Sequence, residues 1–255
     1  MKSLISFAPT LAHLFGISPP HLAQSEPFPE LSDSTAPIRK ALIFCPDAFG
    51  VHALEHLPAL ENRLKASSTH EVALESVYPP VTPVCFASLF TGALPEAHGI
   101  QKYEKPVLTC DTVFDAFIRA GKKVAIVAVA QSSVDLIFRG RNLDYFSMPY
   151  DPLVTLKAEE LIVRGEHDLI VAYHQEYDDL LHDTNPFSEL ALKALEHHVE
   201  SWEYFTQTCQ KHWQKEFLVA FTPDHGAHTD SRTGRGDHGE NRPEDMNLRH
   251  FFYLK

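Results

Sequence analysis

The sequence from Thr82 to Ile100 reads TPVCFASLFTGALPEAHGI. It follows a strand-like segment at residues 72–77, and its short apolar run ends at Thr91 and Gly92. We expect a helix to begin at Thr82, where the threonine could serve as the N-cap, as a reactive hydroxyl, or as both. A polar residue between a strand and a helix is where an α/β sheet carries its chemistry.

The rest of the chain alternates between strand-like and helix-like segments. The strand-like runs are continuously apolar, which is what a sheet covered on both faces requires. We expect strands at residues 38–45, 72–77, 123–130, 168–173 and 217–222, and helices at residues 57–66, 112–120, 153–164 and 187–213. The sequence therefore predicts an α/β fold, with three α/β/α layers built on a mainly parallel central sheet.

Length, composition and charge indicate one acidic globular domain. The 255 residues are 44% hydrophobic, so we expect a single domain over residues 1–255, with an N-terminal helix and connection in residues 1–36. The formal net charge is −12, which disfavours nucleic acid and anionic membranes as partners. No apolar run is long enough to cross a bilayer. We therefore expect a small-molecule partner; the sequence does not indicate the oligomeric state.

The chain has four cysteines, Cys45, Cys85, Cys110 and Cys209. They are far apart and lie mostly in apolar runs, which is typical of thiols in a reducing compartment rather than of a disulfide framework. Residues 2–17 have one basic residue and an apolar stretch, as a signal peptide does, but they contain Pro9 and His13 and lack a clean cleavage site. We expect a cytoplasmic protein, with a periplasmic or secreted one as the alternative.

Acidic and imidazole side chains follow several of the apolar runs. Asp47 comes after the first run, in CPDAFG, and Asp224 and His225 come after the last, in FTPDHG. Alone, Asp47 would more often be a turn or cap residue. Asp224 and His225 can face one ion only if the chain turns between them, and Gly226 is expected to provide the backbone freedom for that turn.

Two further groups lie in the second half of the chain. Asp178 and His182 are four residues apart, so one helical turn places both side chains on one face, with Asp179 as the competing ligand. His238 lies in the loop GDHGE, whose glycines permit close approach, whereas His228 is interpreted as a surface residue. The combined carboxylate and imidazole ligands suit two divalent cations, zinc in the first place and manganese as the alternative, and indicate catalysis rather than scaffolding.

The stretch 82–100 resembles the alkaline phosphatase superfamily, and most closely its type I phosphodiesterase/nucleotide pyrophosphatase branch. It is similar to that branch's nucleophile helix and to the Thr-Gly, Pro-Glu and His-Gly-Ile landmarks that follow, here at residues 91–92, 95–96 and 98–100. The resemblance extends from the first strand to the C-terminal loop. It implies an alkaline-phosphatase-like core and a hydrolase acting on phosphoric esters.

The resemblance also implies a role for each candidate residue. Thr82 would be the nucleophile and would contact the first metal, whose ligands would be Asp47, Asp224 and His225. The second metal would be bound by Asp178, His182 and His238. The metals would activate the Thr82 hydroxyl for in-line attack, stabilise the leaving oxygen and supply hydroxide to hydrolyse a phosphothreonine. Backbone N–H groups at the helix start could help hold the phosphoryl oxygens. His98 is expected to be structural.

The chain departs from the family pattern at several positions. Cys85 stands where the animal nucleotide pyrophosphatases have an asparagine, so nucleotide specificity does not carry over. Asp47-Ala48 replaces the familiar Asp-Gly, and the formylglycine signature of sulfatases is missing around Thr82. A phosphodiesterase is favoured slightly over a phosphomonoesterase. A phosphomutase, a phosphonate hydrolase and a non-catalytic metal-binding descendant are the alternatives.

The N-terminal sequence SFAPTLAHLFGISPP, residues 6–20, resembles the Ala-Pro-Thr helix that these enzymes carry after their last metal-binding histidine. In this chain it comes first. We hypothesise a circularly permuted core element, with the two termini close together. The Pro- and Ser-rich residues 18–37 are expected to form a surface connection.

Few residues remain for a cap that selects the substrate. We expect rim loops only at residues 99–111 and 140–152, and therefore a small or weakly discriminated phosphoester. Tyr103, Tyr145 and Phe146 could stack on a leaving group there, although aromatic residues in such segments are more often part of the core.

Overall fold

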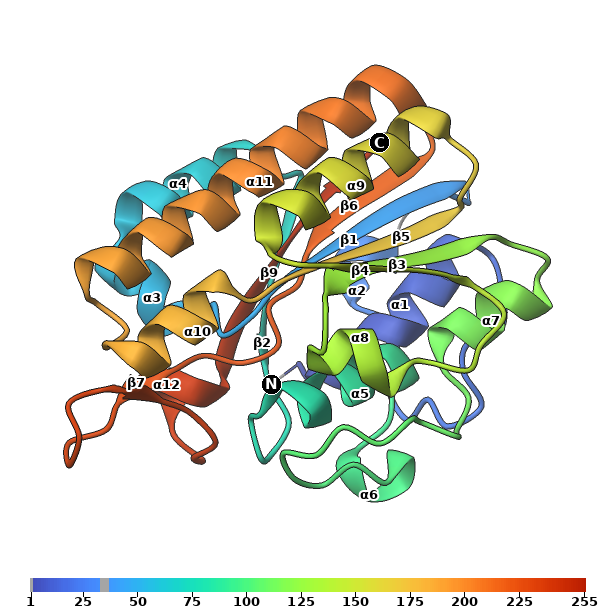
Figure 1. The fold of residues 1–255 in the computed structure, drawn as a ribbon. Helices are drawn as coiled ribbons and strands as arrows, with labels where there is room; N and C mark the ends of the chain where they lie inside the picture. Colours follow the sequence, from blue (N-terminus) through green and yellow to red (C-terminus); the bar gives the residue numbers. More distant parts are fainter. Residues whose placement is uncertain (1, 33–36) are drawn as a thin grey trace.

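The computed structural model describes residues 2–32 and 37–255, and its centre is a seven-stranded sheet with the order β2-β9-β6-β1-β5-β3-β4. The strands are β1 (Lys40–Pro46), β2 (His70–Glu75), β3 (Val124–Val129), β4 (Asp144–Met148), β5 (Leu169–His174), β6 (Phe217–Phe221) and β9 (Asn247–Leu254). β9 runs antiparallel to its neighbours β2 and β6, and the other four pairs are parallel. The predicted α/β fold with a mainly parallel sheet is confirmed (Figure 1).

Helices cover both faces of this sheet (Figure 1). The first face carries η1 (Leu4–Ser6), α1 (Phe7–Leu14), α2 (Pro29–Ser32), α5 (Thr82–Thr91), α7 (Val113–Arg119) and α8 (Ser133–Ile137). The second carries α3 (Val51–His56), α4 (Pro58–Ala66), α9 (Asp151–Arg164) and α11 (Glu189–Trp213). The short helices α6 (Pro95–His98), α10 (Glu176–Asp183) and α12 (Pro243–Met246), and the ribbon of β7 (His228–Thr229) and β8 (Gly236–Asp237), lie outside the sheet.

The continuous apolar runs form central strands because both of their faces are buried. In β1, Ile43 belongs to the core on the first face, whereas Leu42 and Phe44 belong to the core on the second. Side chains alternate between the faces of a strand, so a strand between two helix layers needs apolar residues at every position. α11 packs on the second face through a single stripe that includes Leu195 and Trp202, which are two helical turns apart.

Every strand and helix that we predicted is present, within a few residues of its expected ends. Two strands of the central sheet, β4 and β9, were not predicted, and neither were the short strands β7 and β8 of the ribbon. β4 lies at the edge of the sheet and is only partly buried, so its sequence lacks the continuous apolar run of a central strand. The expectation that residues 140–152 form a rim loop is therefore wrong, because β4 pairs with β3 and Asp151 already belongs to α9.

The N-terminal segment packs beside β9 on the first face. The rings of Phe7 and His250 are 6.2 Å apart, and Phe28, within the expected surface connection, is fully buried with its ring 6.3 Å from that of Phe252. Residues 33–36 of that connection lie outside the described residues.

The expectation that the two termini lie close together is wrong. The carbonyl of Lys2 accepts a hydrogen bond from the amide of Glu75, next to the start of β9, whereas Lys255 pairs with Phe217 beyond the end of β9. An eight-residue strand, roughly 25 Å long, separates the two positions. The permuted origin of α1 stays a prediction.

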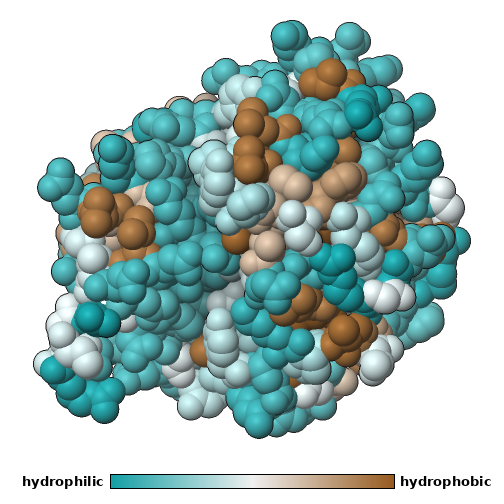
Figure 2. All heavy atoms as spheres, viewed as in Figure 1, coloured by the Kyte–Doolittle hydropathy of each residue, from teal (hydrophilic) through white to brown (hydrophobic). Residues whose placement is uncertain are grey.

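The surface in view is mostly hydrophilic, with hydrophobic residues in small separate groups (Figure 2). Charged residues make up 22% of the chain, which agrees with this polar surface. Among the described residues, no helix combines the length and the apolar composition that crossing a membrane would require.

Candidate active site

The candidate site lies at the carboxyl edge of the sheet. Asp47 directly follows β1, α10 follows β5 after the single residue Gln175, and Asp224 comes shortly after β6. β1 pairs in parallel with both β5 and β6, so the segments that follow these strands meet at one edge. The structure thereby brings together residues that are far apart in the sequence.

The first group consists of Asp47, Asp224 and His225, all buried. One ligand atom from each lies within 4.8 Å of the others. The Nε2 atom of His225 is 3.4 Å from Oδ1 of Asp47 and 3.4 Å from Oδ2 of Asp224. The structure thus assembles the three residues that the resemblance assigns to the first metal.

The second group consists of Asp178, His182 and His238. The Nε2 atoms of His182 and His238 are 3.5 Å and 3.4 Å from Oδ1 of Asp178. Asp178 and His182 share a face of α10, as their spacing predicted. The ring of His238 is stacked 4.1 Å from that of His225, so the two groups form one continuous centre.

Backbone carbonyls orient the three imidazoles. Nδ1 of His182 is 3.1 Å from the carbonyl oxygen of Gly236, and Nδ1 of His238 is 3.0 Å from that of Pro80. Nδ1 of His225 is 3.0 Å from its neighbour's carbonyl oxygen. A carbonyl can only accept, so each Nδ1 donates its proton to it and each Nε2 faces the carboxylates, which is how metal-binding histidines are usually oriented.

One carboxylate oxygen of each aspartate is buried without a hydrogen-bond partner among the described residues. These atoms are Oδ1 of Asp47, Oδ1 of Asp178 and Oδ2 of Asp224, the same oxygens that face the imidazole Nε2 atoms. A buried, unpaired carboxylate oxygen is strongly unfavourable, and a divalent cation would satisfy it. The donor set therefore fits two such cations.

The charges of the site are balanced by protons in the absence of cations. Burial, together with the charge of Asp178, raises the pKa of Asp47 to about 8, and burial also raises the pKa of Asp224. Burial opposes ionisation of Asp178, but the imidazoles of His182 and His238 beside it outweigh burial and lower its pKa. Burial alone would lower the pKa of His238, but the Asp178 carboxylate outweighs burial and raises the pKa of His238 to about 9. Bound cations would displace these protons.

Thr82 is the first residue of α5, and its Oγ1 atom lies 3.4 Å from Nε2 of His225. The N-cap is Val81, so the N-cap interpretation of Thr82 is wrong, and its hydroxyl is directed at the first group of ligands. The amides of Val84 and Cys85 donate to the carbonyl of Val81, and Pro83 has no N–H. Thr82 itself therefore carries the backbone N–H that remains for a phosphoryl oxygen at this helix start.

A cavity of 220 Å³ opens at the two groups. It is lined by Asp47, Thr82, Tyr103, Lys105, Ala130, Gln131, Ser132, Ser133, Tyr173, Gln175, Asp178 and Asp179. The loop at residues 99–111 contributes Tyr103 and Lys105 to this lining, in agreement with its prediction as a rim loop. Tyr145 instead donates to the carbonyl of Phe138 and Phe146 packs in the core of the second face, so of the three aromatic candidates only Tyr103 lines this cavity.

One segment of the chain is similar to a known protein family. Residues 41–115 match the profile of the family described as type I phosphodiesterase/nucleotide pyrophosphatase. This segment contains Asp47 and Thr82. Over this segment the chain is similar to that family. No curated protein sequence matches it significantly.

Several solved structures share the fold of this chain. Murine ectonucleotide pyrophosphatase/phosphodiesterase 5, an inactive form in complex with AMP, is 18% identical with a TM-score of 0.60, covering 76% of this chain and 59% of the murine one. Phosphonoacetate hydrolase from Sinorhizobium meliloti, in complex with phosphonoformate, is 17% identical with a TM-score of 0.58, over 78% and 59% of the two chains. A 2-O GAG sulfatase is 13% identical with a TM-score of 0.61, over 86% and 64%. The chain spans less than two thirds of the length of each.

The site contains residues that the sequence did not predict. The hydroxyl of Tyr173 donates a hydrogen bond to Oδ2 of Asp47, and the ammonium group of Lys105 donates to the carbonyl of Gln131 at 2.9 Å. Tyr173 lies in a buried apolar strand and reads as a core residue, so no sequence signal distinguishes it. Lys105 is one of two lysines in the predicted rim loop, with Lys102, and its charge was the available signal.

Two expectations about neighbouring residues are wrong. Gly226 does not adopt a left-handed conformation; it is glycine because a Cβ there would lie 2.1 Å from the carbonyl oxygen of Glu244. His228 is not on the surface; it is buried, with Nδ1 2.7 Å from a carboxylate oxygen of Asp245. His98 is buried and hydrogen-bonded to Ser88 at 2.9 Å, which agrees with a structural role.

Proposed function

We propose that the chain is a metal-dependent hydrolase of phosphoric esters, with diesters preferred to monoesters and Thr82 as the nucleophile. The observation that carries this proposal is the position of the Thr82 hydroxyl, 3.4 Å from His225 Nε2 and beside three buried carboxylate oxygens that lack partners among the described residues. A hydroxyl is a weak nucleophile, and a centre of this kind can activate it.

Each group of three ligands would hold one divalent cation, zinc in the first place and manganese as the alternative. When bound, the cations would lower the pKa of the Thr82 hydroxyl and neutralise charge on the phosphoryl group. Asp47, Asp224 and His225 would hold one cation beside Thr82, and Asp178, His182 and His238 would hold the other.

The residues of the chain support a two-step displacement. Oγ of Thr82 forms a bond to phosphorus, the bond to the leaving oxygen breaks, and the leaving group takes up the proton that Thr82 loses. Water then hydrolyses the phosphothreonine and restores the Thr82 hydroxyl. Thr82 and Lys105 both line the cavity, and we propose that the Thr82 amide and the Lys105 ammonium group contact the remaining phosphoryl oxygens.

The substrate is proposed to be small. The cavity at Thr82 measures 220 Å³, and the loop at residues 99–111 supplies Tyr103 and Lys105 to its lining. Cys85, which stands where animal nucleotide pyrophosphatases have an asparagine, is buried and hydrogen-bonded to Ser76, so it does not provide a phosphoryl contact. The likeness to phosphonoacetate hydrolase keeps a phosphonate as the second candidate substrate.

We also retain two broader predictions. Residues 1–255 are proposed to act as one catalytic domain. A cytoplasmic location is supported by the four cysteines, which are unpaired in the structure, three of them buried.

The proposal is tested by hydrolysis of bis-p-nitrophenyl phosphate and p-nitrophenyl phosphate, with zinc or manganese, by the unsubstituted chain and by Thr82→Ala and Thr82→Ser. We expect preference for the diester, loss of turnover by about 10³-fold or more in Thr82→Ala, and partial activity in Thr82→Ser. Preference for the monoester would indicate a phosphatase. Turnover of phosphonoacetate alone would indicate a phosphonate hydrolase, and no turnover of any of them with metal bound would contradict the proposal.

A further inference from the structure

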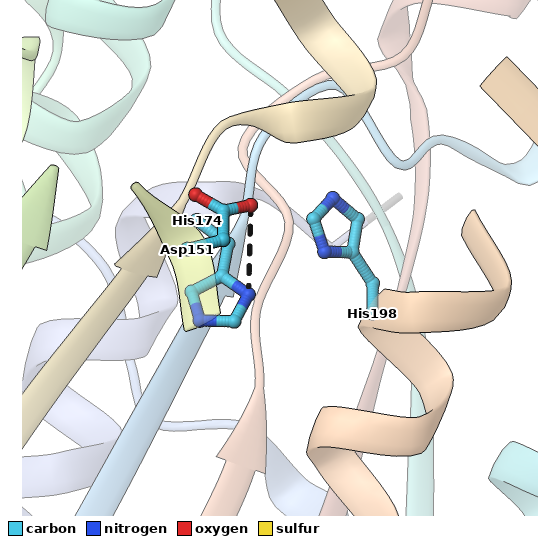
Figure 3. A group of neighbouring side chains, drawn as sticks. All are labelled: Asp151, His174 and His198. Carbon is cyan, nitrogen blue, oxygen red and sulfur yellow. Dashed lines mark ion pairs between the residues drawn. The ribbon is translucent and has the colours of Figure 1, made fainter. Parts of the chain in front are cut away.

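A third group of metal-ligand side chains lies on the second face of the sheet, apart from the candidate active site. Asp151 is the first residue of α9, His174 is the last residue of β5, and His198 lies on the buried stripe of α11. One ligand atom from each lies within 4.8 Å of the others, and all three are buried. Figure 3 shows the three side chains converging from three separate elements.

No hydrogen bond within the described residues explains why a polar side chain occupies position 198. It is fully buried, and neither of its ring nitrogens has a hydrogen-bond partner among residues 2–32 and 37–255. Its ring lies 6.3 Å from that of Phe44 and 6.4 Å from that of Phe49, and 5.6 Å from the ring of His174. A phenylalanine would suit such surroundings better, because an unpaired buried imidazole loses its contacts with water and gains none.

His174 and Asp151 leave a space that suits a cation. Nε2 of His174 lies 3.1 Å from the hydroxyl of Thr155, while Nδ1 faces Oδ2 of Asp151 at 3.7 Å, which is too long for a hydrogen bond. Two ligands of one tetrahedral zinc ion are typically about 3.3 Å apart, close to this separation. Burial lowers the pKa of both His174 and His198 to about 3, so both imidazoles are neutral and keep a lone pair for a metal.

The surroundings supply the remaining features of a metal site. The Asp151 carboxylate accepts hydrogen bonds from the amides of Gln175, at 3.1 Å, and Glu176, at 2.9 Å, which fix its direction. A cavity of 480 Å³ is lined by Asp151 and His174, so an ion there would be open to water as a further ligand.

We infer that Asp151, His174 and His198 bind one divalent transition-metal ion of the zinc class, at a site separate from the two proposed at Thr82. One carboxylate and two imidazoles with an open position are a donor set that such ions take readily. The ion also has a structural consequence. The carboxylate of Asp151 accepts from the amides of the N-cap and of the first residue of α10, the helix that carries Asp178 and His182. A bound ion would therefore stabilise the start of this helix.

The first test is metal content. The unsubstituted chain, His198→Phe and the control His167→Phe are dialysed against Zn²⁺ or Co²⁺, and bound metal is counted by mass spectrometry. His167 is also a buried histidine beside a carboxylate, that of Asp144 at 2.7 Å, but it lies outside all three groups. We expect His198→Phe to bind one equivalent fewer and to lose one set of Co²⁺ absorption bands, with no change in His167→Phe. Equal metal content in folded His198→Phe and the unsubstituted chain would overturn the inference.

A second variant and a second measurement keep the test decisive if His198→Phe does not fold. Asp151→Asn keeps an oxygen acceptor for the α10 amides but removes the charge, and we expect it to weaken binding at the third site by about 10-fold or more. Anomalous diffraction at the zinc edge should give a peak between Asp151, His174 and His198. Absence of this peak at saturating zinc would reject the site. The proposed hydrolase is tested separately, because loss of turnover in Thr82→Ala does not depend on the third ion.

Discussion

The hydroxyl of Tyr173, on β5, donates a hydrogen bond to Oδ2 of Asp47 at the end of the neighbouring strand β1. This contact leaves Oδ1 of Asp47 unpaired, 3.4 Å from Nε2 of His225. A core strand residue thereby orients a proposed metal ligand. Hydrogen bonds of this kind to a ligand usually change metal affinity without contacting the metal.

Tyr173→Phe should therefore weaken zinc binding by about 10- to 100-fold. Turnover should fall at limiting zinc and recover in excess zinc, as a titration of activity against free zinc would show. Tyr145→Phe is the matched control, because the Tyr145 hydroxyl donates to the Phe138 carbonyl, outside the cavity. Identical zinc titrations for all three proteins would mean that Tyr173 does not position the ligand.

Tyr103→Ala tests contact with the leaving group. Tyr103 lines the cavity at Thr82 and is 61% exposed, so its ring is free to stack on an aryl group. We expect KM for bis-p-nitrophenyl phosphate to rise about 2- to 10-fold with little change in kcat. Tyr204→Ala removes an exposed ring from α11 and should leave KM unchanged. An unaltered KM in Tyr103→Ala would place the leaving group elsewhere.

The backbone at Ala48 is strained. Ala48 has φ 59°, a left-handed conformation that favours glycine, and it stands where the familiar family sequence has glycine. Ala48→Gly should raise the free energy of unfolding by about 0.5 to 1 kcal/mol, measured by urea denaturation. Ala53→Gly, within α3, should lower it by about 1 kcal/mol. A loss of stability in Ala48→Gly would show that the strain is already relieved.

Stability should fall below neutral pH through His250. This residue is fully buried, and burial lowers its pKa to about 4. The neutral imidazole stabilises the fold above the unfolded pKa of about 6.5, and this contribution is lost as pH falls toward 4. Between pH 7 and pH 5 the unsubstituted chain should lose about 1 to 2 kcal/mol more than His250→Phe. Parallel losses in the two proteins would rule out this source of acid sensitivity.

Removal of metal should make stability fall as pH rises. In the metal-free site the pKa of Asp47 is about 8 and that of His238 about 9, both above their ordinary values. For groups with raised pKa values, stability is present at low pH and is lost as pH rises through those values. With EDTA, Tm should drop by about 5 °C between pH 6 and pH 9, and zinc should reduce the drop. The same pH dependence of Tm with and without zinc would contradict zinc binding by Asp47 and His238.

The sequence predicted those features of the fold and of the site that have a signal within a few neighbouring residues. The apolar runs before Asp47 and Asp224 predicted buried strands, and the four-residue spacing of Asp178 and His182 predicted a shared helix face, because both signals lie within a few residues. The edge strand β4 was missed because it is only partly buried and has no such signal. His228 was misjudged because its partner, Asp245, lies in a separate helix, α12.

The sequence by itself determined the α/β fold, the order of its main elements and the chemical types of the candidate ligands. It could do so because hydrophobic periodicity and residue chemistry are local properties. The tertiary structure decided which ligands share a centre, that Tyr173 reaches Asp47, and that Asp151, His174 and His198 converge behind the sheet. These contacts depend on which strands become neighbours and on the register of their pairing, which the packing of both helix layers sets over the whole chain.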